Sequence, residues 1–275
     1  MQCDVAGLPA DDGCRVRRQA IIAAMAVRIE VSEEAGVRYL HFGSSWIQGA
    51  MRIARPWALE LEYTREMMIA LLLRSGRWPR DVLIVGLGAA SIAKFLHRHC
   101  PRARLHVVEI EPKVVAAARQ FFRLPDEDPP HFAIEIADAD DYVARTRRRF
   151  DLVVLDGFDA SGRAGALDTP RFYDRARTLL TDRGVMCVNL LGRSRGFRAS
   201  VLRMADAFDN RVVALASCDS GNVIAFAATG QPIDLSFPEL RLRAAKLRRE
   251  TALNLLPTLA RLTATQAGND DRFLL

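Results

Sequence analysis

The chain has 275 residues and half of them are hydrophobic, which is enough for one large domain with a full core and a small appendage. No apolar run reaches the ~18 residues of a transmembrane helix, and charged residues interrupt the N-terminal stretch, so neither a membrane span nor a signal peptide is expected. The net charge of +6 comes from arginines spread along the chain without an aromatic-rich basic strand, which argues against a nucleic-acid partner.

The first part of the chain is expected to form a tail and a small sheet. Residues 1–20 are interpreted as a disordered tail, and residues 21–57 as an antiparallel β meander whose strands are separated by turn residues. The strands of the meander are predicted at 27–31, 37–42 and 46–53. Pro56 is predicted to begin a helix that runs to about Arg74. The positions at helical spacing, which we expect to face the core, are Leu59, Tyr63, Met67 and Leu71.

Residues 58–230 alternate between strand and helix patterns, which is typical of a parallel sheet covered on both faces. Strands are predicted at 82–86, 105–109, 132–136, 151–156 and 184–190, and helices at 91–99, 112–122, 139–146, 171–180 and 196–208. A hairpin of strands 211–216 and 222–228 must be antiparallel. This α/β arrangement resembles the Rossmann-like sheet of class I S-adenosylmethionine-dependent transferases. Residues 231–275 are expected to form a C-terminal helical extension, broken near Pro257.

The segment from Asp81 to Glu109 indicates a nucleoside site. An apolar strand meets Gly86 and Gly88, a helix follows, and a second apolar strand ends on Glu109. Gly86 permits a sharp turn, Gly88 permits close approach to the backbone, and the helix N-terminus lies beneath the ligand. A carboxylate at the tip of the second strand can bind two ribose hydroxyls. The alternative is an ordinary turn between a strand and a helix.

Acidic residues also follow the next two strands, at the edge where parallel sheets bind ligands. Asp138 is expected to contact an adenine, to cap the following helix, or to do both. Asp156 follows a buried strand and lies close in sequence to Asp159. Burial and a nearby like charge would both raise the pKa of Asp156, which suits proton transfer; the alternative is a solvated turn residue.

Taken together, these residues resemble the spermidine synthase family of polyamine aminopropyltransferases, over about Val27 to Thr229. The matching segments are Gly-Leu-Gly-Ala-Ala-Ser, Val108-Glu109-Ile110-Glu111, Ala137-Asp138-Ala139, Leu155-Asp156-Gly157-Phe158-Asp159, and Gln48. The resemblance implies that an aminopropyl group moves from decarboxylated S-adenosylmethionine to a polyamine such as putrescine, with Asp156 as proton acceptor. It assigns the donor to Gln48, Gly86, Gly88, Glu109, Asp138 and Ala139, and the amine to Tyr63, Asp156 and Asp159. Neither a metal nor a tightly bound cofactor is implied.

Three positions depart from the family pattern. Ala89 stands where the family carries an aspartate that holds the aminopropyl amine, Ala160 replaces a proline of the catalytic loop, and Arg65 occupies the place of a histidine. An arginine near the donor tail would favour the carboxylate of intact S-adenosylmethionine. The alternatives are therefore a methyltransferase of the same fold or a non-catalytic thioadenosine-binding protein. A NAD-dependent dehydrogenase is disfavoured, because the fingerprint ends in serine. The amine acceptor stays open.

Surface features complete the prediction. The densest basic clusters, 147–149 and 241–250, are interpreted as solvated helix faces. Apolar positions in and beside the meander suggest a subunit interface, and we expect a homodimer, as in the family; packing on the main domain is the alternative. These positions are Trp46, Ile47, Ile53 and Trp57. Five cysteines without a Cys-x-x-Cys pair indicate neither a disulfide framework nor a zinc site, so a reducing cytoplasm fits best.

Overall fold

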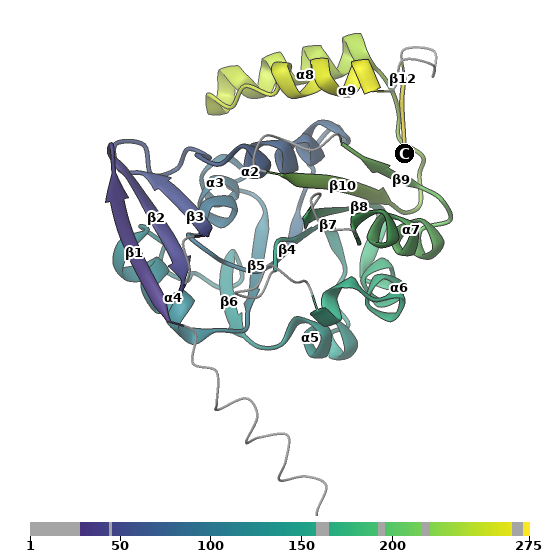
Figure 1. Cartoon of the computed structure of the whole chain (residues 1–275). Coiled ribbons are helices and arrows are strands. Elements are labelled where there is room, and N and C mark those ends of the chain that lie inside the picture. The colour runs from purple at the N-terminus through teal and green to yellow at the C-terminus, as the bar shows by residue number, and fades with distance from the viewer. Residues whose placement is uncertain (1–27, 44–45, 158–164, 192–195, 216–220, 266–271) are drawn as a thin grey trace, which may run out of the picture.

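The computed structural model describes residues 28–43, 46–157, 165–191, 196–215, 221–265 and 272–275 (Figure 1). The tail predicted over 1–20 lies outside these residues, as do Asp159 and Ala160.

The predicted meander is present as a three-stranded antiparallel sheet. Its strands are β1 (Ile29–Glu34), β2 (Val37–Phe42) and β3 (Ile47–Arg52). Ala35 and Gly36 both have positive φ, at 50° and 74°, which lets the chain reverse between β1 and β2. The meander stands beside one end of the main sheet (Figure 1).

The main sheet has seven strands in the order β6-β5-β4-β7-β8-β10-β9. The strands are β4 (Asp81–Val85), β5 (Arg104–Glu109), β6 (Phe132–Ile136), β7 (Phe150–Leu155), β8 (Leu180–Leu191), β9 (Val212–Ala214) and β10 (Asn222–Ala228). Strands β4 to β8 pair in parallel, whereas β10 pairs antiparallel with both β8 and β9. The parallel sheet closed by an antiparallel hairpin confirms the predicted class I Rossmann-like fold.

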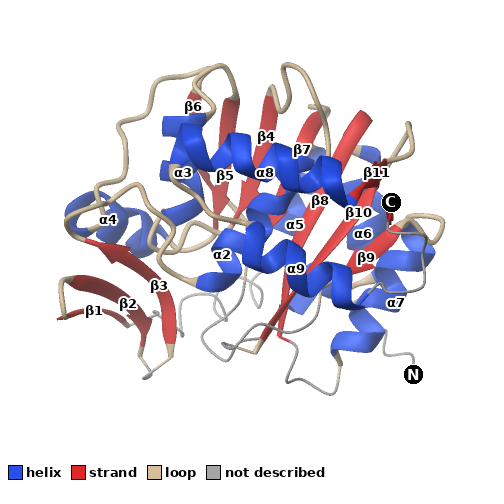
Figure 2. Ribbon diagram, turned by 90° about the horizontal axis from the view of Figure 1, so that it is seen from above, coloured by secondary structure: helices blue, strands red, loops and turns tan. Residues whose placement is uncertain are grey.

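Helices cover both faces of this sheet (Figure 2). Side chains alternate along each strand, so Val82 and Ile84 pack in one apolar cluster and Leu83 and Val85 in another. The first cluster lies under α3 (Ser91–His99), α4 (Pro112–Phe121) and the C-terminal helices. The second lies under α5 (Ala139–Arg145), α6 (Pro170–Thr178) and α7 (Phe197–Ala207), and a short 3-10 helix, η2 (Gly165–Asp168), precedes α6.

The helix predicted from Pro56 to Arg74 is largely wrong. The observed elements are α2 (Glu62–Met67) and a 3-10 turn, η1 (Met68–Leu72). The backbone is still extended at Leu61, with φ −80° and ψ 139°. Just before it, Glu60 is bound to Arg52, whose Nε donates to Oε2 at 3.1 Å. This ion pair fastens the preceding segment to β3, so the helix begins six residues later than the sequence pattern suggests.

The C-terminal extension consists of α8 (Phe237–Thr251) and α9 (Leu256–Thr265). The break falls just before Pro257, as predicted, where Ala252 has a positive φ of 64°. Arg261 of α9 donates to Glu62 Oε1 at 2.7 Å and also pairs with the fully buried Glu66, so this extension fastens α2. Two strands that we did not predict, β11 (Asp234–Ser236) and β12 (Arg272–Leu274), pair beside it.

Two surface predictions have different outcomes. Residues 241–250 do lie on a helix, α8. Residues 147–149 do not, because α5 ends at Arg145 and β7 begins at Phe150, so these arginines form the connection between them. Within the described residues, no helix is both long enough and apolar enough to cross a membrane.

Candidate active site

Asp156 follows the buried end of β7 and has a hydrogen-bond donor on each carboxylate oxygen. Tyr63 of α2 donates its hydroxyl to Oδ2 at 3.2 Å, and Asn189 of β8 donates its amide Nδ2 to Oδ1 at 2.8 Å. The sequence prediction placed Tyr63 against a ligand, and in the structure its hydroxyl contacts Asp156, the predicted proton acceptor. These two donors fix the plane of the carboxylate.

Asn189 is a site residue that the sequence prediction missed. It is 4% exposed, and its Oδ1 accepts a hydrogen bond from Nδ2 of Asn222 at 2.8 Å. Because its oxygen is occupied by Asn222, its NH2 group is turned toward Asp156. The sequence did contain a hint, since Asn189 is a polar residue inside an otherwise apolar strand.

The electrostatics of this cluster suit proton transfer. Burial is the main cause that raises the pKa of Asp156, to about 6, and the hydrogen bonds from Asn189 and Tyr63 partly oppose it. Burial and the nearby Asp156 raise the pKa of Tyr63 well above its usual value, so the phenol stays protonated and remains a donor. Asp156 is therefore a carboxylate at neutral pH whose pKa lies close to it.

The glycine turn is shaped by contacts within the protein. Gly86 has a φ of +89°, and a Cβ there would lie 2.3 Å from the carbonyl oxygen of Asp156. Gly88 has a φ of +50°, and a Cβ there would lie 3.1 Å from the carbonyl oxygen of Gln48. The sequence prediction assigned this close approach to a ligand. The structure shows that β3 already approaches the loop at Gly88, so this glycine also lets the meander pack against the main sheet.

Ala89 is directly involved in this contact. It is 2% exposed, and a Cβ placed on Gly49 of β3 would lie 2.6 Å from the Ala89 Cβ. The position that carries an aspartate in the family pattern is therefore filled by a small side chain packed against β3. A longer acidic side chain would collide with this strand.

Glu109 ends β5 as predicted and is 7% exposed. Its Oε2 accepts from the Leu87 backbone N–H at 2.8 Å, and its Oε1 accepts from the Glu111 N–H at 2.9 Å. Burial raises its pKa, and these backbone hydrogen bonds counteract the rise. The carboxylate thus supports the glycine turn, and a carboxylate has about four acceptor positions, which is more than these backbone groups occupy.

Asp138 follows β6 at the neighbouring strand end and caps α5, because its Oδ1 accepts from the Asp140 N–H at 2.7 Å. The capping alternative raised from the sequence is thus confirmed. Its side chain is exposed, while the adjacent Ala139 is buried. Glu109 and Asp138 end adjacent strands, since Glu109 pairs with Ile136.

A small cavity lies between β3, the glycine turn and Asp156. It encloses about 10 Å³, close to the space of one water. Its polar lining comes from Gln48, Tyr63, Thr64, Ser91 and Asp156, beside the glycine turn. Among the described side chains that line it, α2 supplies Tyr63 and Thr64 but not Arg65. Tyr63 and Asp156, which are hydrogen-bonded to each other, both line this space.

Comparisons with known proteins show the family of this chain. A family model described as the spermine/spermidine synthase domain matches residues 61–190. The polyamine aminopropyltransferase of Chromobacterium violaceum is 35% identical over 261 residues, which cover 95% of this chain and 98% of that protein. The polyamine aminopropyltransferase of Neisseria meningitidis is 32% identical over 247 residues, which cover 90% of this chain and 93% of that protein.

Solved structures share the fold. A human methyltransferase-like protein 13 in complex with SAH has a TM-score of 0.61 and 26% identity, and the match covers 70% of this chain and 93% of that chain. A spermidine synthase in complex with the transition state analogue AdoDATO has a TM-score of 0.61 and 22% identity, covering 85% of this chain and 84% of that chain. SAH and AdoDATO, respectively, are the compounds bound to those two proteins.

Proposed function

The chain belongs to the spermine/spermidine synthase family and is a transferase, and we propose that it moves an aminopropyl group from decarboxylated S-adenosylmethionine to a polyamine such as putrescine. The observation that carries this proposal is the Asp156 cluster. A carboxylate with a pKa of about 6, held by Tyr63 and Asn189, faces the cavity beside the glycine turn.

The chemistry requires a base at this place. The amine nitrogen attacks the methylene carbon next to the sulfonium, a C–N bond forms, and the C–S bond breaks as methylthioadenosine leaves. An ammonium group has no lone pair, so a proton must first leave the acceptor nitrogen, and Asp156 takes it. Much of the remaining rate enhancement comes from aligning nitrogen, carbon and sulfur. Tyr63, Asp156 and Asp159 would bind the amine; Asp159 lies outside the described residues.

The adenosyl half of the donor would lie along the ends of β4, β5 and β6. Glu109 would accept hydrogen bonds from the ribose hydroxyls, and Gly86 and Gly88 would let the donor cross the turn. Asp138 and Ala139 would contact the adenine, and Gln48 would contact the donor from β3. The order of these strands brings the groups to one edge of the sheet, where open parallel sheets bind ligands.

A methyltransferase that uses intact S-adenosylmethionine is the second candidate. Ala89 favours it, because the packing against Gly49 leaves no acid there to hold an aminopropyl ammonium. The likeness to methyltransferase-like protein 13, at 26% identity, supports the same alternative. Binding of a thioadenosine without turnover would indicate a non-catalytic relative. Because Ala89→Asp would force a carboxylate against β3, donor preference is better tested by binding.

The test is calorimetric titration of the protein with methylthioadenosine, decarboxylated S-adenosylmethionine and the intact form, followed by turnover with putrescine. Preference for the decarboxylated donor supports aminopropyl transfer, and preference for the intact donor supports the methyltransferase. Asp156→Asn is expected to abolish turnover while methylthioadenosine binding stays within about tenfold, because the base acts on the amine. Undiminished turnover in that variant would exclude Asp156 as proton acceptor.

We also propose a homodimer. Trp46, Ile47 and Ile53 are 56%, 48% and 42% exposed on and beside the meander, which supports an interface there. Trp57 instead packs on the main domain, beneath the Arg98 guanidinium at 5.6 Å from its ring centre. Sedimentation analysis of the wild type and Ile47→Lys distinguishes the cases: dissociation in the variant supports the interface, and a monomeric wild type rules it out.

A further inference from the structure

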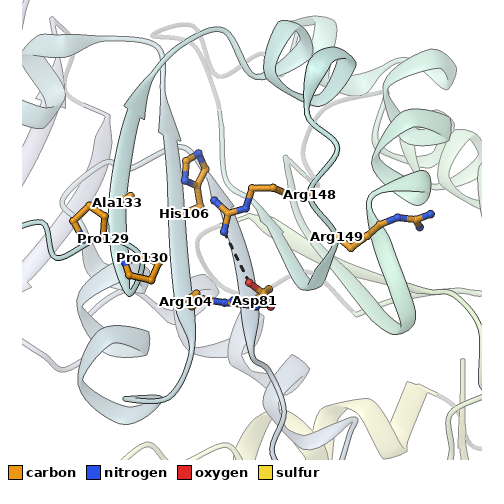
Figure 3. Close-up of a pocket in the computed structure, with 8 residues that line it drawn as sticks. All are labelled: Asp81, Arg104, His106, Pro129, Pro130, Ala133, Arg148 and Arg149. Carbon is orange, nitrogen blue, oxygen red and sulfur yellow. Dashed lines mark hydrogen bonds and ion pairs between the residues drawn. The ribbon is translucent and has the colours of Figure 1, made fainter.

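A second hollow lies at the opposite edge of the main sheet from Asp156, where the parallel strands begin. Its volume is about 590 Å³, which falls within the range of small-molecule sites. The side chains that line it are Asp81, Arg104, His106, Pro129, Pro130, Ala133, Arg148 and Arg149 (Figure 3). It includes two arginines of the 147–149 cluster, which the active site does not use.

Arg148 has uncommitted hydrogen-bond donors in this hollow. Its Nη2 lies 3.9 Å from Asp81 Oδ1, which is beyond hydrogen-bond distance. The other oxygen of Asp81 is already bound to Arg104. The Arg148 side chain is 42% exposed, and its guanidinium lies over the Phe150 ring at 5.3 Å. The stacked ring holds the guanidinium in place while its edge stays open to the hollow.

The neighbouring charges add to this positive character. Arg149 donates a hydrogen bond from Nη1 to the carbonyl oxygen of Leu180 at 3.0 Å. Because this carbonyl is neutral, the hydrogen bond does not compensate the charge of the Arg149 guanidinium. Arg104 interacts with the carboxylates of Asp81 and, at longer range, Asp151. Three arginines and one aspartate line the hollow, so the charge of its lining is positive.

His106 has an unused ring nitrogen beside these arginines. It is 9% exposed and stacks on Tyr142, and its Nε2 lies 3.3 Å from Glu135 Oε2. Its buried Nδ1 has no hydrogen-bond partner within the described part of the chain. Buried polar atoms are nearly always paired, and this nitrogen is an exception among the described residues. Burial, followed by the charge of Arg148, lowers the pKa of His106, so the ring is neutral at pH 7.

We propose that this hollow, the basic pocket, binds a small phosphate-bearing anion. The Arg148 and Arg104 guanidinium groups would donate charge-assisted hydrogen bonds to its oxygens. Pro129, Pro130 and Ala133 form an apolar wall for the rest of the ligand. A small ligand is favoured over RNA because the donors converge within a hollow. An RNA backbone would engage exposed arginines outside it as well, such as Arg147.

The test is calorimetric titration of the full-length protein with inorganic pyrophosphate, which lacks any adenosine for the active site to bind. Arg148→Ala is compared with Arg147→Ala, a control that removes the same charge from an exposed neighbour outside the lining. Loss of a charge-assisted bond is expected to weaken pyrophosphate binding about tenfold or more in Arg148→Ala, and about twofold or less in Arg147→Ala. Thermal melting confirms that both variants fold.

Each other outcome overturns the proposal. Absence of saturable binding to the wild type at millimolar pyrophosphate means that the hollow is not an anion site. Equal losses in the two variants mean diffuse attraction to a basic surface. If a short oligoribonucleotide binds more tightly than pyrophosphate, and its binding depends on both Arg147 and Arg148, the hollow is part of a nucleic-acid surface. The basic pocket is remote from Asp156, so these results do not depend on whether the chain transfers an aminopropyl group.

Discussion

Replacing Asn189 with leucine is expected to move the pH dependence of catalysis. The substitution keeps a similar volume and removes the amide that donates to Asp156 Oδ1 at 2.8 Å. That hydrogen bond favours the ionised carboxylate, so its loss must raise the pKa of Asp156. Because Asp156 acts as a base only when ionised, the variant requires a higher pH for the same activity.

The size of the effect follows from the geometry. A hydrogen bond to a charged group contributes about 1.5–3 kcal/mol, and one pKa unit corresponds to about 1.4 kcal/mol. Asp156 keeps the Tyr63 hydroxyl and adjoins a cavity that accommodates water, so we expect a rise of about one unit. The pKa would then move from about 6 to about 7. At pH 6 the ionised fraction falls from about a half to about a tenth, which lowers kcat/KM about fivefold.

The assay is kcat/KM from pH 5 to 9 for the wild type and Asn189→Leu. Above pH 8 the two are expected to agree within about twofold, because both carboxylates are ionised there. Asn222→Ala is expected to shift the acid limb in the same direction by less, since it frees the Asn189 amide to rotate. A folded Asn189→Leu protein with an unchanged acid limb would refute this reasoning.

Three further predictions concern the ligand and the fold. Glu109→Ala is expected to weaken methylthioadenosine binding by about 1.5–3 kcal/mol in a calorimetric titration. The neighbouring control, Glu111→Ala, is expected to leave the affinity within about twofold of the wild type. Equal affinities in the two variants would show that Glu109 is not the ribose ligand. Burial lowers the pKa of Lys94 from 10.5 to about 7, so the unfolded chain binds more protons in this window and stability rises with pH. Between pH 7.5 and 8.5, the free energy of unfolding in urea should rise by about 1 kcal/mol more for the wild type than for Lys94→Met. The same pH dependence of this free energy in both proteins would contradict the prediction. Arg261→Ala removes the partner of the fully buried Glu66 and is expected to lower the free energy of unfolding by about 3 kcal/mol. The additional change Glu66→Leu is expected to restore most of this loss. A loss below about 1 kcal/mol would mean that the Glu66 carboxyl group is neutral in the folded protein.

Local patterns in the sequence predicted the main elements well. The apolar runs before Gly86 and Glu109 have the length of buried strands, and the predicted bounds of β4 and β5 differ from the observed ones by one residue. The helix over 91–99 agrees at both ends. Alternation of strands and helices then constrains the topology to a parallel sheet, so the sequence alone predicts that the acids at the strand ends lie at one edge.

Contacts between distant segments were not predictable in this way. Asn189 and Asn222 meet because antiparallel pairing places Ile224 opposite Asn189, and no local pattern specifies that register. The helix starting at Pro56 was wrong because the ion pair from β3 competes with helical periodicity. The arginines at 147–149 were interpreted as a helix face from their charge alone, although the predicted helix ended at 146 and α5 ends at Arg145.

The sequence by itself determined the succession of strands and helices along the chain, the glycine turn and the acids that follow the strands, because each depends on a few consecutive residues. Only the tertiary structure decided which donors reach Asp156, how closely Ala89 packs on Gly49, and that a basic pocket forms at the far edge. The physical reason is that these features join segments separated by tens of residues, whose approach is set by sheet register and by the packing of whole elements rather than by local preference.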